Sequence, residues 1–357
     1  MMKSARFACV VGAPRCGTTS LASFLRNHPE VCFSSVKEPH FFAQYDLTAL
    51  PTEELRERVT DEYLARYFAD CPSSASTLAE ASVTYLYAPE RMEPILRLWP
   101  DAKFIIAVRD PLEMLPSLHR RLMYLGDETE TDFARAWALS GERAEGRSIP
   151  RTCVDPRWLR YDQAGRLGTY VENFFSAVGR DRCMVMVFDD LAADPAAVHR
   201  QLLDFLELSP QDAPDLTARR LSQGFRFGWL QRLLKRPPIA TRAILAGEAY
   251  RQRVSRSNGR GPESAVVKAV LAGRKRLLQW NKMPAPPIRL PNGLADEISA
   301  ALRSEIERLS ALIDRDLSHW LNGKTRSGRV VPPTGLEPVA PALRRLVTPS
   351  EKAISFR

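Results

Sequence analysis

The chain has 357 residues, a formal net charge of +9 and a hydrophobic share of 45%, which is ordinary for a globular protein with enough material for a core. No stretch approaches the roughly 18–20 apolar residues that a membrane-spanning helix needs, and the apolar run at residues 7–11 is too short for a secretory signal. The six cysteines form no disulfide framework, and no CxxC or Cys/His cluster indicates zinc. We therefore expect a cytoplasmic protein with reduced cysteines and no metal.

The chain alternates predicted strands with predicted helices as far as residue 206. Short apolar runs predict buried strands at residues 7–11, 31–33, 77–81, 103–108 and 184–188. Helical spacing and capping residues predict a helix from about Thr18, a helix at 52–69 capped by Thr52, and helices at 89–99, 111–125, 132–139 and 195–206. This order is typical of an α/β fold with a central parallel sheet and helices on both of its faces.

After residue 210 the pattern predicts helices alone. Short basic helices are expected at about 211–290, broken at 257–262, and a closing helix at 294–322 with an apolar stripe. The stripe consists of Ile298, Leu302, Ile306, Leu309 and Ile313. Residues 324–357 contain Pro, Gly and Arg without a period, which predicts a disordered tail. The predicted organisation is one domain at 1–323, with its core at 5–210, followed by that tail.

The turn between the first strand and the first helix has the composition of an anion site. We call it the phosphate loop; it consists of Gly12, Ala13, Pro14, Arg15, Cys16, Gly17, Thr18, Thr19 and Ser20. Free N–H groups and a partial positive charge at a helix N-terminus favour an anion there, and the loop adds one arginine and three hydroxyl groups. Glycine-containing turns also occur for geometry alone, but the arginine and the hydroxyls favour the anion site.

The loop matches the nucleotide-binding pattern GxxxxGK[ST] except at the lysine position. Gly12 and Gly17 fit the pattern, but Thr18 stands where the lysine should be, and no apolar run ending in Asp supplies a magnesium ligand. A nucleoside triphosphate needs that lysine and that metal. The loop therefore suits a phosphate ligand of lower charge density that is bound without metal.

A second anion site is predicted where the strand at 103–108 ends. Arg109 follows that strand, and Ser117 lies eight residues later in the next predicted helix. Ligands of open α/β sheets bind at the carboxyl ends of the strands. The alternative is a capped turn in which Arg109 pairs with Asp110; we expect Asp110 to be a helix N-cap rather than a ligand contact.

Four stretches, in order, resemble one known family, the sulfotransferases that use 3′-phosphoadenosine 5′-phosphosulfate (PAPS). The phosphate loop is similar to their 5′-phosphosulfate loop, whose pattern is close to G-x-P-[KR]-x-G-T-[ST]. Lys37-Glu38-Pro39-His40-Phe41-Phe42 resembles the catalytic-base segment of the carbohydrate branch, including the heparan sulfate enzymes. Val108-Arg109-Asp110-Pro111 with Ser117 resembles the 3′-phosphate motif, and 185–191 resembles a later strand. The likeness covers residues 5–210 well and 290–322 loosely.

This resemblance implies a P-loop NTPase-like sulfotransferase fold with a helical C-terminal part. It implies an enzyme that transfers the sulfuryl group of PAPS to a hydroxyl or amine and releases adenosine 3′,5′-bisphosphate without metal. Residues 12–20 would hold the phosphosulfate, and Arg109 and Ser117 the 3′-phosphate. The acceptor would be a glycan, a glycolipid or a lipid-like metabolite.

The resemblance and the chemistry together point to the reacting groups. An attacking alcohol must lose its proton, so Glu38 is the candidate general base, and Arg15 and Lys37 are the cations for the leaving oxygen. His119 is a rival base, because the small-molecule branch uses a histidine. His40 is expected to be a packed or hydrogen-bonded loop residue.

Three further positions carry expectations of their own. Ala81 stands where the carbohydrate branch often has a lysine, so one cation is missing or is supplied elsewhere. Phe188 could stack on adenine or lie in the core. Cys16 lies in a cationic setting at a helix N-terminus that could lower its pKa.

The positive charge belongs to one late segment. Residues 211–290 hold 17 Lys and Arg against 4 Asp and Glu, a net charge of +13, which leaves −4 for the rest of the chain. Within 219–282 the basic residues alternate with Trp and Leu. Three interpretations stay open: solvated faces of amphipathic helices, an acidic acceptor, or peripheral contact with an anionic membrane. Nucleic acid is not expected, because no recognised DNA- or RNA-binding module is present.

Two other function classes remain as alternatives. A P-loop nucleotide-dependent small-molecule kinase is disfavoured by Thr18 at the lysine position. A basic anion- or nucleic-acid-binding protein is disfavoured by the mildly acidic body of the chain. The oligomeric state is left open by the sequence.

Overall fold

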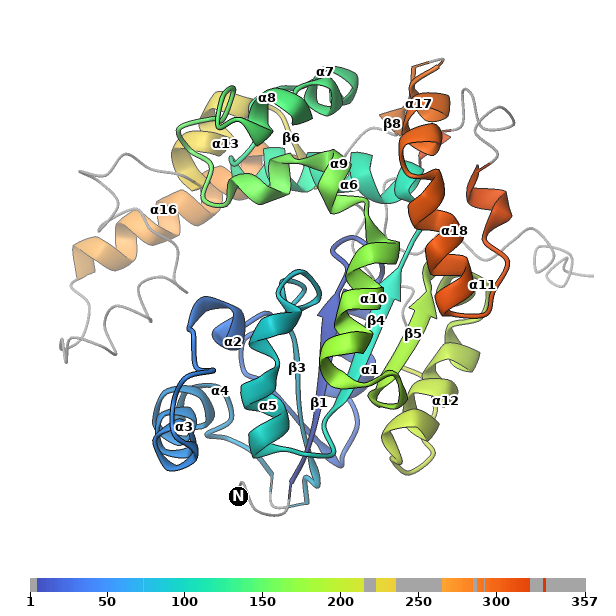
Figure 1. Cartoon of the computed structure of the whole chain (residues 1–357). Helices are drawn as coiled ribbons and strands as arrows, with labels where there is room; N and C mark the ends of the chain where they lie inside the picture. Colours follow the sequence, from blue (N-terminus) through green and yellow to red (C-terminus); the bar gives the residue numbers. More distant parts are fainter. Residues whose placement is uncertain are drawn as a thin grey trace, which may run out of the picture.

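A five-stranded parallel sheet forms the centre of the protein. The computed structural model describes residues 5–72, 74–214, 223–235, 265–284, 288–291, 293–321 and 330–331. The strands are β1 (Arg6–Gly12), β2 (Val31–Phe33), β3 (Thr77–Ala81), β4 (Lys103–Val108) and β5 (Cys183–Val187), in the order β2-β3-β1-β4-β5 (Figure 1). All five predicted strands are confirmed. The predicted fold class, α/β with a central parallel sheet, is confirmed as well.

Helices cover both faces of this sheet. On one face α1 (Thr18–Arg26) meets α12 (Pro195–Leu206), where the rings of Phe24 and His199 lie 4.7 Å apart. On the other face lie α5 (Glu93–Leu98) and α10 (Leu167–Val178), the latter through contact of Phe174 with Phe104 of β4. The apolar side chains of β1 and β4 are buried between the two layers, as expected for central parallel strands.

The remaining helices of the sheet domain lie in the connections between its strands, except α11, which follows the last strand, β5. They are α2 (Phe41–Gln44), α3 (Thr52–Arg58), α4 (Ala65–Tyr67), α6 (Pro111–Leu125), α7 (Phe133–Ala138), α8 (Ser140–Ala144), α9 (Tyr161–Ala164) and α11 (Phe188–Ala193). In Figure 1 the strands run upward, and α6 lies beyond their carboxyl ends. This places α6 at the sheet edge where a ligand is expected.

Three predicted helices are interrupted. The stretch 89–99 consists of a 3₁₀ turn (Pro89–Arg91) and α5, with Met92 between them. The stretch 52–69 consists of α3, a π-helical turn (Val59–Leu64) and α4. Thr52 does not cap it: Pro51 occupies the N-cap, and the Thr52 hydroxyl accepts a hydrogen bond from Arg97 instead. The closing helix divides at Leu302 into α17 (Leu294–Ala301) and α18 (Arg303–Leu312), although Ile298, Leu302, Ile306 and Leu309 are buried as predicted.

The expectation that no strand follows residue 210 is wrong. Strand β6 (Gln223–Phe225) pairs with β7 (Lys282–Pro284), and β8 (Ile288–Arg289) pairs with β9 (Val330–Val331). These pairs join segments far apart in the sequence, so no local pattern of apolar residues predicts them. The helices of this region are α13 (Gly228–Lys235) and α16 (Ala265–Asn281). The break at 257–262 and the tail apart from β9 lie outside the described residues.

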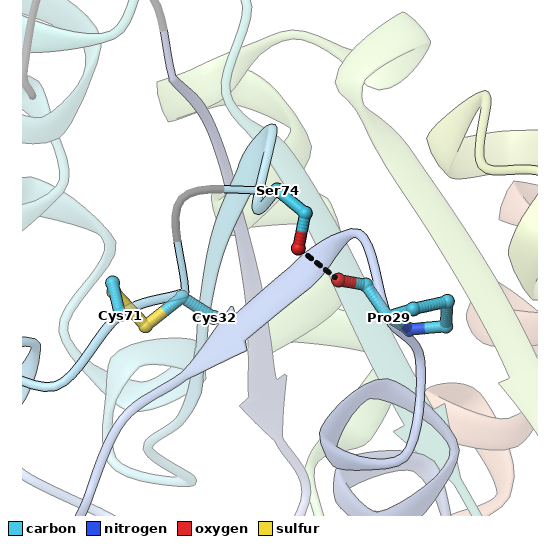
Figure 2. Close-up of a disulfide and its surroundings, with 4 residues drawn as sticks. All are labelled: Pro29, Cys32, Cys71 and Ser74. Atoms are coloured by element: carbon cyan, nitrogen blue, oxygen red, sulfur yellow. Dashed lines mark hydrogen bonds between the residues drawn. A yellow bond between two sulfur atoms is a disulfide. The ribbon is translucent and has the colours of Figure 1, made fainter.

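A disulfide bond joins Cys32 of β2 to Cys71 after α4, with their Cα atoms 5.3 Å apart. Figure 2 shows the bond beside a hydrogen bond from the Ser74 hydroxyl to the carbonyl oxygen of Pro29. The bond closes a loop that contains Lys37 and Glu38 and fixes both of its ends at the sheet. The expectation that every cysteine is reduced is therefore wrong for this pair, because cysteines 39 positions apart show no recognisable spacing.

The disulfide predicts the number of reactive thiols. In denaturant without reductant, the protein should expose four thiols, those of Cys9, Cys16, Cys153 and Cys183. Cys71→Ser should raise the number to five, because Cys32 loses its partner, whereas Cys183→Ser should lower it to three. Thiol titration with a chromogenic disulfide reagent measures this. Six reactive thiols in the unreduced wild type would contradict the assignment.

Candidate functional site

The phosphate loop needs both of its glycines. Gly17 has a left-handed φ of +89° at the N-cap of α1, and a Cβ there would lie 2.7 Å from Leu191 Cδ2. A Cβ on Gly12 would lie 2.8 Å from Leu86 Cβ. The backbone N–H of Ala13 donates to the carbonyl oxygen of Ala107 at 2.7 Å and so fixes the loop to β4. The loop is therefore a closely packed turn that opens α1.

The hydroxyl residues of the loop begin helix α1. Thr18 and Ser20 are buried, whereas Thr19 is exposed. The first turn of α1 contains no acidic residue. Its N-terminal N–H groups therefore keep their preference for an anion.

The two predicted anion sites meet. The Nε of Arg15 donates to the Ser117 hydroxyl at 2.9 Å, and Arg109 donates to the carbonyl oxygen of Arg15 at 3.4 Å. Arg109 is 1% exposed and pairs with Glu113 at 2.7 Å. Asp110 caps α6 by accepting from the N–H of Leu112, as predicted. Arg109 thus pairs with Glu113, whereas the alternative interpretation had Arg109 pair with Asp110.

Arg120 and Arg121, also on α6, belong to the same cationic cluster and were missed from the sequence. Burial, together with the charges of Arg121, Arg109 and Arg120, lowers the pKa of Arg15 to about 10. Burial also lowers the pKa of Arg120. Arg120 and Arg121 lie three and four residues after Ser117, so they share a helix face with it. This spacing is the feature of the sequence that indicates both arginines. Four guanidinium groups close together favour an anionic ligand.

Cys16 and Phe188 support this cluster. Cys16 is fully buried, and burial raises the pKa of its thiol to about 12 although Arg109 and Arg15 oppose the shift. The expectation of a lowered pKa is therefore wrong. Phe188 begins α11, and its buried ring lies 4.1 Å from the guanidinium carbon of Arg109. Its packing against Arg109 is a cation–π contact.

Glu38 lies in a loop after β2, with Lys37 and His40 next to its two carboxylate oxygens. Lys37 donates to Oε1, and His40 Nε2 lies 3.7 Å from Oε2. Burial raises the pKa of Glu38, but the hydrogen bonds and charges of His40 and Lys37 outweigh it and hold this pKa at about 2. His40 also bonds the Thr84 hydroxyl through Nδ1 at 2.9 Å, which confirms the expected hydrogen-bonded loop histidine.

Glu80 supports this loop from inside the core, and sequence reasoning assigned it no role. It is fully buried on β3 and accepts hydrogen bonds from Tyr63, Tyr85 and Ser82, at 2.8, 2.9 and 2.5 Å. Ser82 in turn accepts from the backbone N–H of His40 at 2.9 Å. Burial raises the pKa of Glu80. A chain of hydrogen bonds thus links the sheet to the Glu38 loop.

His119, the rival base, points into the core. It is 4% exposed, packs against the rings of Phe133 and Tyr161, and bonds the carbonyl oxygen of Glu130 through Nε2 at 2.7 Å. Burial lowers its pKa. An acceptor cannot reach this imidazole without rearrangement of the core.

The Glu38 loop and the phosphate loop share a neighbour. Residues 83–86 follow β3; the carbonyl oxygen of Val83 lies 3.2 Å from where a Gly12 Cβ would be, and Thr84 bonds His40. The Glu38 loop and the phosphate loop therefore lie at the same edge of the sheet, where the carboxyl ends of the strands are. Among the described residues there is no group of three or more His, Cys, Asp or Glu that could hold a metal ion.

Comparison with known proteins agrees with this arrangement. The sequence model of the sulfotransferase family matches residues 8–212, which include the phosphate loop, Glu38, Arg109 and Ser117. The chain belongs to the sulfotransferase family. A solved sulfotransferase from Alicyclobacillus acidocaldarius shares its fold, with a TM-score of 0.58, 24% identity, and coverage of 88% of this chain and 97% of that one.

The chain is also similar to curated proteins that are named as carbohydrate or heparan sulfate sulfotransferases. Mouse carbohydrate sulfotransferase 15 is 25% identical over 246 residues, covering 56% of this chain and 43% of that protein. Mouse heparan sulfate glucosamine 3-O-sulfotransferase 3B1 is 26% identical over 203 residues, covering 56% and 46%. Human bifunctional heparan sulfate N-deacetylase/N-sulfotransferase 3 is 26% identical over 206 residues, covering 56% and 22%. This sulfotransferase spans less than half the length of these relatives.

The Glu80 network predicts a large stability effect. Glu80→Ala leaves three buried hydroxyl groups without their acceptor and should lower the free energy of unfolding by about 2–4 kcal/mol. Denaturant unfolding measures this. Glu80→Gln keeps an oxygen for both tyrosines and should lose less, and the exposed control Glu53→Ala should change stability by no more than about 0.5 kcal/mol. A wild-type stability of Glu80→Ala would contradict the role given to this carboxylate.

Proposed function

We propose that this sulfotransferase uses PAPS as its sulfuryl donor. The observation that carries the proposal is the meeting of Arg15, Arg109 and Ser117 at the N-terminus of α1. PAPS carries two anionic groups, a 5′-phosphosulfate and a 3′-phosphate, and the residues present fit both. The phosphate loop offers a glycine-lined backbone for the first, and Arg109, buried just before α6, offers a cation for the second.

The residue roles follow from that fit. Gly12–Ser20 would hold the 5′-phosphosulfate through backbone N–H groups and hydroxyls, and Arg15 would face its negative charge. Arg109 and Ser117 would hold the 3′-phosphate, since a guanidinium and a hydroxyl both donate to phosphate oxygens. Thr18 at the lysine position supports a reaction without metal.

The reaction exchanges one S–O bond for another bond to sulfur. The acceptor oxygen or nitrogen bonds to the sulfur of PAPS, the bond from sulfur to the bridging oxygen breaks, and adenosine 3′,5′-bisphosphate leaves with the electron pair. The acceptor proton passes to Glu38. Arg15 and Lys37 stabilise the negative charge on the leaving oxygen.

The proposed base is ionised at neutral pH. Lys37 and His40 hold the pKa of Glu38 at about 2, so the carboxylate is ready to accept a proton. A pKa of about 2 makes a weak base, and a move of Lys37 toward the leaving oxygen during proton transfer would remove one of the interactions that lower it. The buried, hydrogen-bonded state of His119 supports Glu38 over this rival.

We propose a hydroxyl or amine of a glycan, glycolipid or lipid-like metabolite as acceptor. The support comes from the relatives named for carbohydrate or heparan sulfate sulfation and from the Glu38 segment of the carbohydrate branch. A cytoplasmic location stays a prediction, against which the Cys32–Cys71 bond weighs, because disulfides are rare in the cytosol.

The nucleotide assignment predicts a preference for adenosine 3′,5′-bisphosphate over AMP. Losing one charge-assisted contact to the 3′-phosphate corresponds to a roughly ten- to hundred-fold change in affinity. Arg109→Lys, which keeps the charge but loses the planar fork, and Ser117→Ala should both reduce the preference. Titration calorimetry with the two nucleotides measures it.

A matched control and two outcomes decide this prediction. Ser140→Ala removes another buried serine, in α8, and should leave the preference unchanged. Equal binding of AMP and the bisphosphate by the wild type would contradict the 3′-phosphate site. A strict requirement of turnover for Mg²⁺, tested with EDTA, would favour phosphoryl transfer instead.

The base assignment predicts a kinetic loss without a loss of nucleotide binding. Glu38→Gln should lower kcat by roughly 10²–10⁴-fold and leave bisphosphate affinity within a few-fold. Because the pKa of Glu38 is about 2, the group stays ionised from about pH 5 to 8, and the loss should be similar across that range. His119→Asn should have a smaller effect. An active Glu38→Gln beside an inactive His119→Asn would overturn the assignment.

A further inference from the structure

The segments around α13 and α16 carry positive charge without compensation by acidic residues. In residues 223–235 and 265–284 there are eight basic side chains and no Asp or Glu. They are Arg226, Arg232, Lys235, Lys268, Arg274, Lys275, Arg276 and Lys282. Arg226, Lys275, Arg276 and Lys282 are exposed. These two segments are therefore the part of the described chain most suited to an anionic partner.

The same segments expose large apolar side chains. Nine such side chains are exposed in the described residues, and six of them lie here. They are Phe227, Trp229, Leu233, Leu277, Trp280 and Met283, with exposed fractions from 40% to 64%. We call these six, with the four exposed basic residues, the basic–aromatic surface. Single exposed apolar residues are ordinary, but a concentration of them marks an interaction site.

Contacts join the members of this surface. The rings of Phe227 and Trp280 are stacked with centroids 5.7 Å apart, and the Arg226 guanidinium lies 5.9 Å from the Trp280 ring. Trp229 and Leu233 are four residues apart on α13, and Leu277 and Trp280 are three apart on α16, so each pair shares a helix face. Phe227, Trp280 and Arg226 are thus neighbours in space, and α13 is in contact with α16, which carries Leu277 and Trp280.

The inner side of the same helices is fixed to the rest of the enzyme. Gln231, Leu234 and Asn281 are buried. The Gln231 side chain donates to the carbonyl oxygen of Tyr124 in α6 at 2.8 Å and accepts from Asn281 at 3.2 Å. In Figure 1, α13 lies beside α6, and α16 projects outward from the sheet domain. The surface is therefore exposed on an anchored element.

We propose that the basic–aromatic surface binds an anionic lipid bilayer. Trp and Phe favour the interface between headgroups and acyl chains, and Leu and Met gain from burial beneath the headgroups. Each Lys or Arg near an anionic leaflet adds about 1 kcal/mol. A nucleic acid or an acidic glycan would use the cations and stack on the rings, but it gives Leu233, Leu277 and Met283 no partner. A second copy of this surface would be repelled by its like charge.

Docking would bring the catalytic edge near the membrane. The surface is attached to Tyr124 at the end of α6, and the same helix carries Ser117, Arg120 and Arg121. An acceptor carried on a lipid would then be presented beside the donor site. Only this consequence rests on the proposed function; the docking itself does not.

Vesicle flotation with the full chain tests the proposal. The protein should float with vesicles of phosphatidylcholine and phosphatidylglycerol, remain unbound with pure phosphatidylcholine, and lose binding as salt rises. Trp229→Glu should weaken vesicle binding at least about ten-fold, because it places a charge where an aromatic ring enters the interface. Val154→Glu changes another exposed apolar residue, outside the surface, and should bind like the wild type.

The results that would contradict membrane binding differ from those that would contradict the catalytic proposal. Unfolding temperature and bisphosphate affinity should be unchanged in both variants, which shows that the fold and donor site are intact. Equal binding to neutral and anionic vesicles, or wild-type binding by Trp229→Glu, would overturn the proposal. So would tighter binding of a DNA duplex or a sulfated oligosaccharide than of vesicles, or a dimer that Trp229→Glu dissociates.

Discussion

Parallel pairing of β1 with β3 on one side and β4 on the other is the constraint on which the rest of the structure depends. Parallel strands need a crossover between each pair, and those crossovers are the helices that bury both faces of the sheet. The same pairing collects every loop that follows a strand at one edge. The phosphate loop, the Glu38 loop and Arg109 therefore become neighbours although the chain separates them by dozens of residues.

Electrostatics at that edge divides the site into two parts. On one side, burial and the like charges of Arg109, Arg120 and Arg121 lower the pKa of Arg15, so an anion bound there would relieve the repulsion. On the other side, Lys37 and His40 hold Glu38 ionised. A proton acceptor and an anion cradle side by side are what transfer of a charged group to a protonated nucleophile requires.

The Glu38 loop is held from two directions. The Cys32–Cys71 bond fixes its ends, and the buried carboxylate of Glu80 fixes its backbone through Ser82. Buried polar networks of this kind are costly when incomplete and rigid when every donor has its acceptor. Rigid support explains how a loop with residues at positive φ, Glu38 and His40, can hold the proposed base in a defined orientation.

The sequence by itself determined the five strands of the central sheet, the phosphate loop and the Asp110 cap, because each depends on neighbours within about one turn or one strand. It also determined the family resemblance, which rests on four short stretches. Only the tertiary structure decided what depends on distant segments. It brought Arg120 and Arg121 to Arg15, paired Cys32 with Cys71, buried His119, and raised rather than lowered the pKa of Cys16. Burial and charge act through space, and local spacing does not encode which distant groups will surround a side chain.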